Sequence, residues 1–229
     1  YLATHKANPK FVVPPKEFSI AEGFLYMLNE GIKAPAFDNH ILDLCLVLHT
    51  EHGGGNNSTF ATYVVASSAS DMYSTIAAAI ASLKGPLHGS ANSKVMEMMA
   101  DIKSNVKDWD NREEVKAYLA KIILGQAHDH SGKIYGLGHA VYTKSDPRAI
   151  VLKEKAKELA KIKGREKELN LYFLIEELGP QLFEEIKGNK KVIAPNVDFY
   201  SGFVYSCLTI PEAVFTPLFG IARVAGWCA

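Results

Sequence analysis

The sequence is short of cysteine, of uninterrupted apolar runs and of net charge, and each shortage counts against a class of protein. It has only three cysteines in 229 residues, and Lys plus Arg equal Asp plus Glu at 25 each. Three scattered cysteines without a CxxC pair indicate buried free thiols in a reducing compartment rather than a disulfide framework. A nucleic-acid-binding domain usually carries a clear basic excess, so the balanced charge disfavours that class.

No segment is suited to crossing a membrane or to directing export. The most apolar stretch, residues 62–83, is interrupted by serine, threonine and aspartate, and it therefore fails as a bilayer helix. No signal peptide or lipidation motif is found either. We expect a cytoplasmic protein that binds neither membranes nor nucleic acid. The chain starts without methionine and stops inside the apolar run 215–229, which predicts an internal part of a longer protein.

What the sequence does have is helical periodicity. Apolar residues recur at the three- and four-residue spacing of one helix face in residues 18–30, and residues 36–49 are apolar almost all round, which predicts a buried helix. Strand signals are nearly absent, so the predicted fold class is all-α. Further helices are expected at 74–83, from about 91 to 106, from 112 to 124 and over 149–187, with a last pair split by Pro211. Candidate N-caps are Asn57 or Ser58, Ser70 or Asp71, and Asp110 or Asn111.

Four polar residues stand beside glycine or proline in loops between these helices: His52, His88, His139 and Asp198. Catalytic groups concentrate in loops that rigid elements hold, because a ligand can approach the backbone there. Taken singly, each residue is weak evidence. A histidine beside a turn is most often a structural hydrogen-bonding group, and an aspartate before a helix is most often an N-cap.

Together with their neighbours, these residues form a specific series of motifs. No single motif is specific, but their order and spacing resemble the citrate synthase family, from about Glu17 to Ala229. In chain order the motifs are Leu48-His-Thr-Glu-His52 with Asn56 and Ser58, Gly85-Pro-Leu-His88-Gly-Ser-Ala-Asn92, Gly136-Leu-Gly-His139-Ala-Val-Tyr with Asp146-Pro-Arg148, Asn196-Val-Asp198-Phe-Tyr-Ser-Gly202, and Ile221-Ala-Arg223-Val-Ala-Gly-Trp227.

This resemblance implies an enzyme that condenses acetyl-CoA with oxaloacetate and releases citrate and CoA, without a metal or prosthetic group. By the family motifs, Asp198 is the base that removes the acetyl methyl proton, and His88 donates a hydrogen bond to the thioester oxygen. The positive end of the helix that follows His88 is expected to keep its imidazole neutral. His139 matches the histidine that polarises the ketone of oxaloacetate and protonates the new alkoxide.

The resemblance also implies residues that bind each substrate. Oxaloacetate is a small dianion, which arginine can bind through paired N–H groups, and Arg148, Arg223, His52 and His139 match family positions that contact it. Out of context, Arg148 would be interpreted as a surface arginine in a turn, whereas Arg223 lies in an apolar helix and needs a partner for its charge. The expected CoA-binding residues are Ile134, Tyr135, Gly136, Leu137, Gly138 and Lys144, the last next to Thr143, where family members commonly carry a basic residue that meets the CoA phosphates.

By analogy with the family, we expect two helical parts and a homodimer. Residues 1–89 and 196–229 are assigned to part of a large helical domain, and residues 90–195 to a small helical domain that closes over the substrates. The alanine-rich stretch 74–83 would let helices approach closely, as in a buried dimer interface. Because family members are longer at both ends, the 229-residue chain alone is expected to be a poor or inactive catalyst.

Three alternatives stay open. The first is a 2-methylcitrate synthase that uses propionyl-CoA, since one methyl group in a pocket is worth only about 1–3 kcal/mol. The second is a non-catalytic helical interaction module with the alanine-rich helix as its surface, although such a module does not need histidine and glycine at four separate turns. The third is a metal-dependent hydrolase, although no HExxH pattern is present. Its candidate ligands are His49, Glu51, His52, His128, Asp129 and His130.

Overall fold

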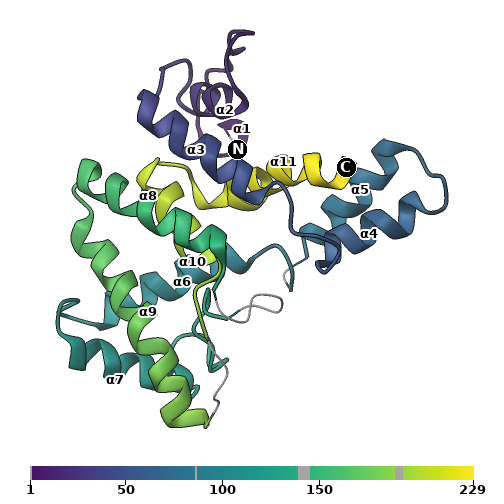
Figure 1. The fold of residues 1–229 in the computed structure, drawn as a ribbon. Coiled ribbons are helices and arrows are strands. Elements are labelled where there is room, and N and C mark those ends of the chain that lie inside the picture. Colours follow the sequence, from purple (N-terminus) through teal and green to yellow (C-terminus); the bar gives the residue numbers. More distant parts are fainter. Residues whose placement is uncertain (1, 86, 139–144, 189–192) are drawn as a thin grey trace. The chain divides into compact units, whose positions relative to one another are not determined.

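The computed structural model describes residues 2–85, 87–138, 145–188 and 193–229, which form helices joined by turns and loops (Figure 1). No strand occurs within these ranges, and one isolated antiparallel bridge joins Leu137 to Pro195. The predicted all-α fold is confirmed. The elements are α1 (Leu2–His5), α2 (Ile20–Leu28), α3 (Ala36–His49), α4 (Asn57–Ala66), α5 (Met72–Leu83), α6 (Ala91–Asn105), α7 (Arg112–Ile123), α8 (Pro147–Lys163), α9 (Glu166–Lys187), α10 (Val197–Cys207), the 3-10 turn η1 (Glu212–Val214) and α11 (Phe215–Cys228).

Side-chain caps fix where several helices begin. Asn56, Asp71 and Asn111 accept backbone N–H groups from the first turns of α4, α5 and α7 respectively. Of the alternatives that the sequence offered, Asp71 and Asn111 are therefore the caps of their helices. The cap of α4 is Asn56 rather than Asn57 or Ser58.

One expected helical stretch is confirmed with a break in it, and the expected burial of another helix is wrong in part. Residues 149–187 are helical as expected, but they form two helices, because the left-handed backbone of Gly164, with φ of 65°, ends α8 before α9 begins. The helix α3 keeps its expected bounds but is not buried all round. Its Ile41 and Leu42 are fully buried, whereas Val47 is 62% exposed. The packed face of α3 is therefore narrower than its composition indicated.

The cysteines and the apolar segments can also be compared with expectation. Cys45 and Cys207 are buried free thiols, as predicted, but Cys228 is exposed. In the part of the chain that the structure describes, none of the helices combines the length and the apolar composition required to cross a bilayer.

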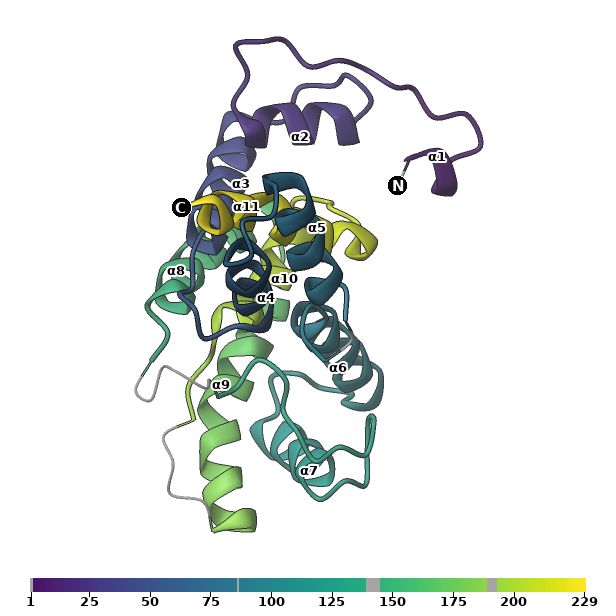
Figure 2. The same cartoon turned by 90° about the vertical axis from the view of Figure 1, so that its right-hand side faces the viewer.

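The chain divides into two compact units, Tyr1–Gly89 with Leu208–Ala229, and Ser90–Cys207. In the first unit, α3 packs against α2 and α11, and α4 lies beside α5 in both views (Figure 1 and Figure 2). In the second unit, α10 packs against α6 and α8, and α7 packs against α9. The expected domains placed residues 196–207 with the first part, whereas α10 lies in the second unit. The assignment of domains in the whole protein stays a prediction.

Helix α10 is the most enclosed helix of the second unit. All its residues are buried except Asp198 and Ser206. Gly202 permits a close approach of α6, since a Cβ added there would lie 2.6 Å from the Sδ atom of Met96. The ring of Tyr172 on α9 lies edge-on to that of Phe199, with 5.4 Å between centroids. Because α10 is packed on nearly all sides, the backbone that carries Asp198 is held in a fixed position.

Candidate active site

The residues predicted to act in catalysis or binding fall into both units. His52, His88 and Arg223 belong to the first unit, and Arg148 and Asp198 belong to the second. The second unit also contains the expected CoA-binding residues 134–138, called the glycine loop below. Two further predicted residues, His139 and Lys144, lie outside the described residues.

His88 lies in the loop after α5 and contacts the start of α4. The backbone N–H of Ser58 donates to Nε2 of His88 at 3.2 Å, and the Ser58 hydroxyl oxygen lies 3.0 Å from the same nitrogen. Because a backbone amide donates, Nε2 is the acceptor, and the proton of the neutral ring is assigned to Nδ1. Burial lowers the pKa of His88, and the positive charge of Arg223 lowers it further. His88 is therefore a neutral imidazole with its N–H donor at Nδ1.

Asn56 fixes the helix start that holds His88. Its Oδ1 accepts the backbone N–H of Thr59 at 3.0 Å and the Thr59 hydroxyl at 3.1 Å, and lies 2.8 Å from Oγ of Ser58. The exposed amides of a first turn carry partial positive charge, which disfavours an imidazolium beside them. The sequence predicted that the helix following His88 would supply this effect. In the structure, the amide that contacts the ring belongs to α4.

Arg223 is a buried cation on α11. Its side chain is almost wholly enclosed, at 2% exposure of the residue, and its Nε donates to the backbone carbonyl of His49 at 2.7 Å. His49 is the last residue of α3, where unpaired carbonyls carry partial negative charge. The guanidinium carbon also lies 4.6 Å from the centroid of the Phe219 ring. The C-terminus of α3 thus supplies part of the negative charge that a cation in an apolar helix requires as a partner.

His52 lies in the turn between α3 and α4. The Oε1 atom of Glu51 accepts the backbone N–H groups of His52, at 2.8 Å, and of Gly53. The side-chain amide of Asn56 donates to the carbonyl of Gly53 at 3.2 Å. Asn56 therefore ties the turn that carries His52 to the helix start that contacts His88.

In the second unit, the glycine loop is fastened to the segment before α10. The N–H of Gly138 donates to the carbonyl of Ala194 at 2.8 Å, and the N–H of Asn196 donates to the carbonyl of Gly136 at 2.9 Å. The side-chain amide of Asn196 donates to the carbonyl of Gly138, also at 2.9 Å. Gly136 has φ of 82°, and a Cβ there would lie 2.9 Å from Cα of Phe199, so only glycine fits.

Asp198 is the second residue of α10 and not its cap. Oδ1 of Asn196, the residue before the helix, accepts the backbone N–H of Asp198 at 3.0 Å, which is the contact of an N-cap side chain. The neighbours Val197 and Phe199 are buried, whereas Asp198 is not. The interpretation of Asp198 as a helix cap was therefore wrong, because Asn196 makes that contact.

Arg148, in the first turn of α8, is buried and paired with Asp146. Its Nε and Nη2 atoms donate to Oδ1 and Oδ2 of Asp146 at 3.0 and 2.8 Å, and the residue is 9% exposed. Burial acts to raise the pKa of Asp146, but the hydrogen bonds and the positive charge of Arg148 outweigh it and hold this pKa below its usual value. The alternative of a surface arginine in a turn is wrong, because the guanidinium is buried and forms an ion pair with Asp146.

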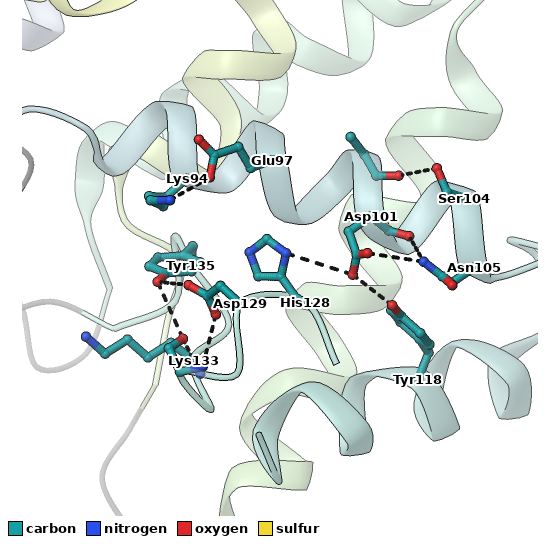
Figure 3. A network of polar contacts seen from close by, with 12 residues as sticks. Lys94, Glu97, Asp101, Ser104, Asn105, Tyr118, His128, Asp129, Lys133 and Tyr135 are labelled. Atoms are coloured by element: carbon teal, nitrogen blue, oxygen red, sulfur yellow. Dashed lines mark hydrogen bonds and ion pairs between the residues drawn. The ribbon is translucent and has the colours of Figure 1, made fainter. Parts of the chain in front are cut away.

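A polar network joins α6 and α7 to residues 128–135, and it contains two of the candidate metal ligands, His128 and Asp129 (Figure 3). Asp101 of α6 accepts a hydrogen bond from Tyr118 of α7 at 2.8 Å and lies 3.9 Å from Nδ1 of His128. The hydroxyl of Tyr135 donates to Asp129 at 2.5 Å. Within the described ranges, no group of three or more His, Cys, Asp or Glu side chains is placed to hold a metal ion. The metal-hydrolase alternative therefore gains no geometric support from these residues.

The comparisons with known proteins agree with the motifs. A family model described as "Citrate synthase, C-terminal domain" matches residues 1–229. A citrate synthase of Synechocystis is 41% identical over 95% of this chain and 50% of its own length. A citrate/2-methylcitrate synthase of Bacillus subtilis is 37% identical over 100% of this chain and 55% of its own.

A solved structure extends this agreement to the fold. The citrate synthase of Thermoplasma acidophilum, in a ternary complex with carboxymethyl coenzyme A and oxaloacetate, superposes with a TM-score of 0.75 at 35% identity. The match covers 93% of this chain and 52% of that one. An all-α chain with these motifs, matched by the family model along its whole length, belongs to the citrate synthase family. It spans about half the length of the curated relatives that it matches.

Three residues that hold the candidate site were not predicted to belong to it, and of these Ser58 was expected only as a possible helix cap. Ser58 contacts His88, Asn196 joins the glycine loop to α10, and Asp146 pairs with Arg148. All three stand inside the motifs that carry the family resemblance. For Asp146, a local signal exists, because an aspartate directly before a proline is typical of a helix N-cap followed by N1.

Proposed function

We propose that this protein joins the acetyl group of acetyl-CoA to oxaloacetate and, with one water consumed, releases citrate and CoA. The observation that carries the proposal is the amide of Ser58 on Nε2 of His88, because it leaves a neutral imidazole with its donor at Nδ1. Enolisation of a thioester needs such a neutral donor for the oxygen, together with a base for the methyl proton. The motif match and the named relatives support the same reaction.

In the first step, Asp198 is the proposed base. Its carboxylate takes a proton from the acetyl methyl group, and the electron pair of the broken C–H bond forms the carbon–carbon double bond of an enolate. His88 donates from Nδ1 to the thioester oxygen as negative charge develops there. The lowered pKa of His88 keeps the ring neutral near pH 7, so that it does not carry the extra proton of an imidazolium.

In the second step, the enolate carbon attacks the ketone carbon of oxaloacetate and a carbon–carbon bond forms. His139 is proposed to donate a proton to the resulting alkoxide, on the strength of the family motif. Water then attacks the thioester carbonyl, the carbon–sulfur bond breaks, and CoA leaves as the thiol. Proton transfer and hydrogen bonding account for each step, so no metal or prosthetic group is proposed.

Oxaloacetate is proposed to bind to Arg148, Arg223, His52 and His139. The two arginines are the buried cations among these residues, and a dianion gains strongly from charge-assisted hydrogen bonds in a water-poor site. Acyl-CoA is proposed to contact the glycine loop, whose left-handed glycines let a ligand approach the backbone closely. The proposed CoA contacts are Ile134, Tyr135, Gly136, Leu137, Gly138 and Lys144.

A homodimer is proposed through the pair α4 and α5. These two helices expose several large apolar side chains, and an interface with a second copy would cover them. The exposed set on α4 and α5 includes Phe60, Tyr63, Val64, Met72, Tyr73 and Ile80. The free thiols Cys45 and Cys207 support the proposal of a cytoplasmic protein.

The function is tested by thiol release from acetyl-CoA in the presence of oxaloacetate, with citrate identified among the products. The protein encoded by the complete reading frame is used, and propionyl-CoA is compared with acetyl-CoA. His88→Gln should lower turnover by about 10²–10³-fold, as expected for loss of a donor to a developing oxyanion. His40→Gln is the matched control, because His40 is an exposed histidine of the same unit, on α3.

Three results would decide the matter. Turnover with acetyl-CoA that exceeds turnover with propionyl-CoA supports the proposal as stated. The reverse preference would favour a 2-methylcitrate synthase, a function that the name of the Bacillus subtilis relative includes. Absence of both thiol release and oxaloacetate binding in the unsubstituted protein would refute both and favour a non-catalytic module.

A further inference from the structure

Asp146 makes more contacts than its position at the start of α8 requires. Its Oδ1 accepts the backbone N–H of Arg148 and Nε of Arg148, both at 3.0 Å. Its Oδ2 accepts Nη2 of Arg148 at 2.8 Å and the backbone N–H of Val197 at 3.0 Å. Each oxygen therefore has two donors, and the residue is 1% exposed. One carboxylate joins the start of α8 to the start of α10.

Capping alone does not explain this arrangement. Asp71 caps α5 with bonds to the N–H and hydroxyl of Ser74, within its own first turn, and it is exposed. Asp146 completes the same kind of cap with Oδ1 alone, through the N–H of Arg148. The contact from Oδ2 to Val197 crosses to a helix 51 residues further along the chain. A buried carboxylate that is expensive to desolvate is thus used to connect two helices.

We propose that Asp146 is a positioning residue, which fixes the orientation of the substrate-binding arginine Arg148 and the position of the base Asp198. The proposal rests on the function proposed above, in which those two residues act. Asp146 is not itself the base, because all its hydrogen-bonding positions are occupied by donors from Arg148 and Val197.

The effect on Arg148 is one of orientation and charge. Two parallel hydrogen bonds to one carboxylate fix the plane of a guanidinium, which a single bond would leave free to turn. The negative charge of Asp146 also compensates the buried positive charge of Arg148. Without it, the guanidinium would be driven toward water and away from the geometry that binds a carboxylate.

The effect on Asp198 passes through the backbone. The first N–H groups of a helix have no partner within the helix, so outside acceptors determine how its first turn is held. Oδ2 of Asp146 holds the N–H of Val197, and Oδ1 of Asn196 holds the N–H of Asp198. The position of a base relative to the proton that it removes must be correct to within a fraction of an ångström. Loss of one hydrogen bond that holds the first turn of α10 should therefore lower turnover measurably.

Two substitutions separate these effects. Asp146→Asn removes the charge and changes both connections. Val197→Pro removes the N–H donor of α10 and replaces a buried isopropyl side chain by a ring, but it leaves the ion pair of Asp146 and Arg148 in place. Proline suits the first helical position, where its missing N–H costs no bond within the helix. Both variants are studied in the protein encoded by the complete reading frame, with oxaloacetate affinity measured by calorimetry and turnover measured by thiol release.

Asp146→Asn should weaken oxaloacetate binding about 10- to 100-fold, the loss expected for one charge-assisted contact, and should also lower kcat. Val197→Pro should lower kcat about tenfold or more and leave oxaloacetate affinity within about twofold of the unsubstituted protein. If Asp146 had a purely structural role, both variants would have a lower urea midpoint. Val197→Pro would then not lower kcat while leaving oxaloacetate affinity unchanged.

Matched controls test the same chemical changes elsewhere in the second unit. Asp110→Asn removes an exposed carboxylate that pairs with Lys167 at 3.2 Å. Arg112→Pro places proline at the first position of α7, after an asparagine with the extended backbone that a following proline requires. Both should leave affinity and kcat unchanged.

The outcomes are distinct. Unchanged oxaloacetate affinity in Asp146→Asn, or unchanged kcat in Val197→Pro, would overturn the positioning role while leaving the proposed function in place. If Asp146→Asn does not fold, Val197→Pro still decides the question, since it leaves the ion pair intact. An unsubstituted protein that neither binds oxaloacetate nor releases thiol would overturn the proposed function, and the role of Asp146 in it.

Discussion

Replacement of Gly136 by alanine tests how closely the glycine loop approaches α10. Gly136 has φ of 82°, a left-handed conformation that alanine adopts only with strain. An added Cβ would also lie 2.7 Å from Cδ2 and 2.9 Å from Cα of Phe199, closer than van der Waals contact allows. Because Cα of Phe199 belongs to a helix that is buried on nearly all sides, the clash cannot be relieved by rotation of a side chain alone.

The magnitude follows from these two contributions and from a matched control. Gly164 has φ of 65° with nothing within 4 Å of an added Cβ, so Gly164→Ala carries the backbone strain alone, about 1–2 kcal/mol. Gly136→Ala carries that strain and an overpacking cost of about 1–3 kcal/mol. The entropy that alanine removes from the unfolded chain is the same in both variants and cancels. Gly136→Ala should therefore be less stable than Gly164→Ala by about 1–3 kcal/mol.

The assay is urea unfolding followed by tryptophan fluorescence. The chain has two tryptophans, Trp109 in the second unit and Trp227 in the first. A Trp227→Phe background leaves Trp109 as the reporter of the unit that contains both glycines. This background costs no hydrogen bond, because the buried indole N–H of Trp227 has no partner. With a slope of about 1–3 kcal/mol per molar urea, the expected difference moves the midpoint by about 1 M.

Equal midpoints for Gly136→Ala and Gly164→Ala would refute this reasoning. They would mean that Phe199 and the loop do not approach as closely as the structure has them. A lower midpoint for Gly136→Ala with the same slope would support the close approach. A changed slope would instead indicate an altered unfolded state or a loss of two-state behaviour.

Three further predictions concern titration and catalysis. The imidazole of His88 should stay neutral as the pH falls below about 6.5, where an unperturbed histidine titrates, and its ring resonances in NMR should therefore shift only at a lower pH. Since the unfolded chain binds that proton first, folding stability should fall as the pH falls from about 6.5 to the pKa of folded His88. Asp146 has a lowered pKa, so its contribution to stability is complete above about pH 3.9 and is lost as the pH falls through its folded pKa; acid unfolding of Asp146→Asn should lack this component. Asp198→Asn should lower kcat by about 10²–10⁴-fold in the thiol-release assay with oxaloacetate affinity retained in calorimetry, and more than half the original turnover would contradict its role as the base.

Apolar periodicity and capping residues predicted the bounds and starts of several helices. The bounds of α3 followed from its apolar run, and Asp71 and Asn111 were among the expected caps. The break between α8 and α9 depended on the left-handed backbone of Gly164, in a stretch whose charged periodicity continues on both sides. A glycine in a helical pattern is often tolerated, so its presence alone did not predict the break.

The sequence predicted which residues belong to the candidate site, but not the contacts between them. The motifs pointed to His88, Arg148 and Asp198, yet the contact of Ser58 with His88 joins residues 30 apart, and that of Asp146 with Val197 joins residues 51 apart. Such contacts depend on how helices pack, which periodicity and capping patterns do not encode. The exposure of Val47 on α3 was missed for the same reason, since a run of apolar residues does not say which of them lack a packing partner.

The two aspartates at these helix starts show why packing decides chemistry. From sequence alone, Asp146 and Asp198 are alike, since each is an aspartate that shortly precedes an expected helical stretch. In the structure, Asp146 is enclosed and accepts hydrogen bonds from Arg148 and Val197 at both oxygens, which holds its pKa low and leaves no position for an incoming proton. At the start of α10 the cap contact is made by Asn196, and Asp198 is one of two residues of α10 that are not buried. This difference in burial supports the proposal that Asp198, rather than Asp146, takes a proton from the substrate.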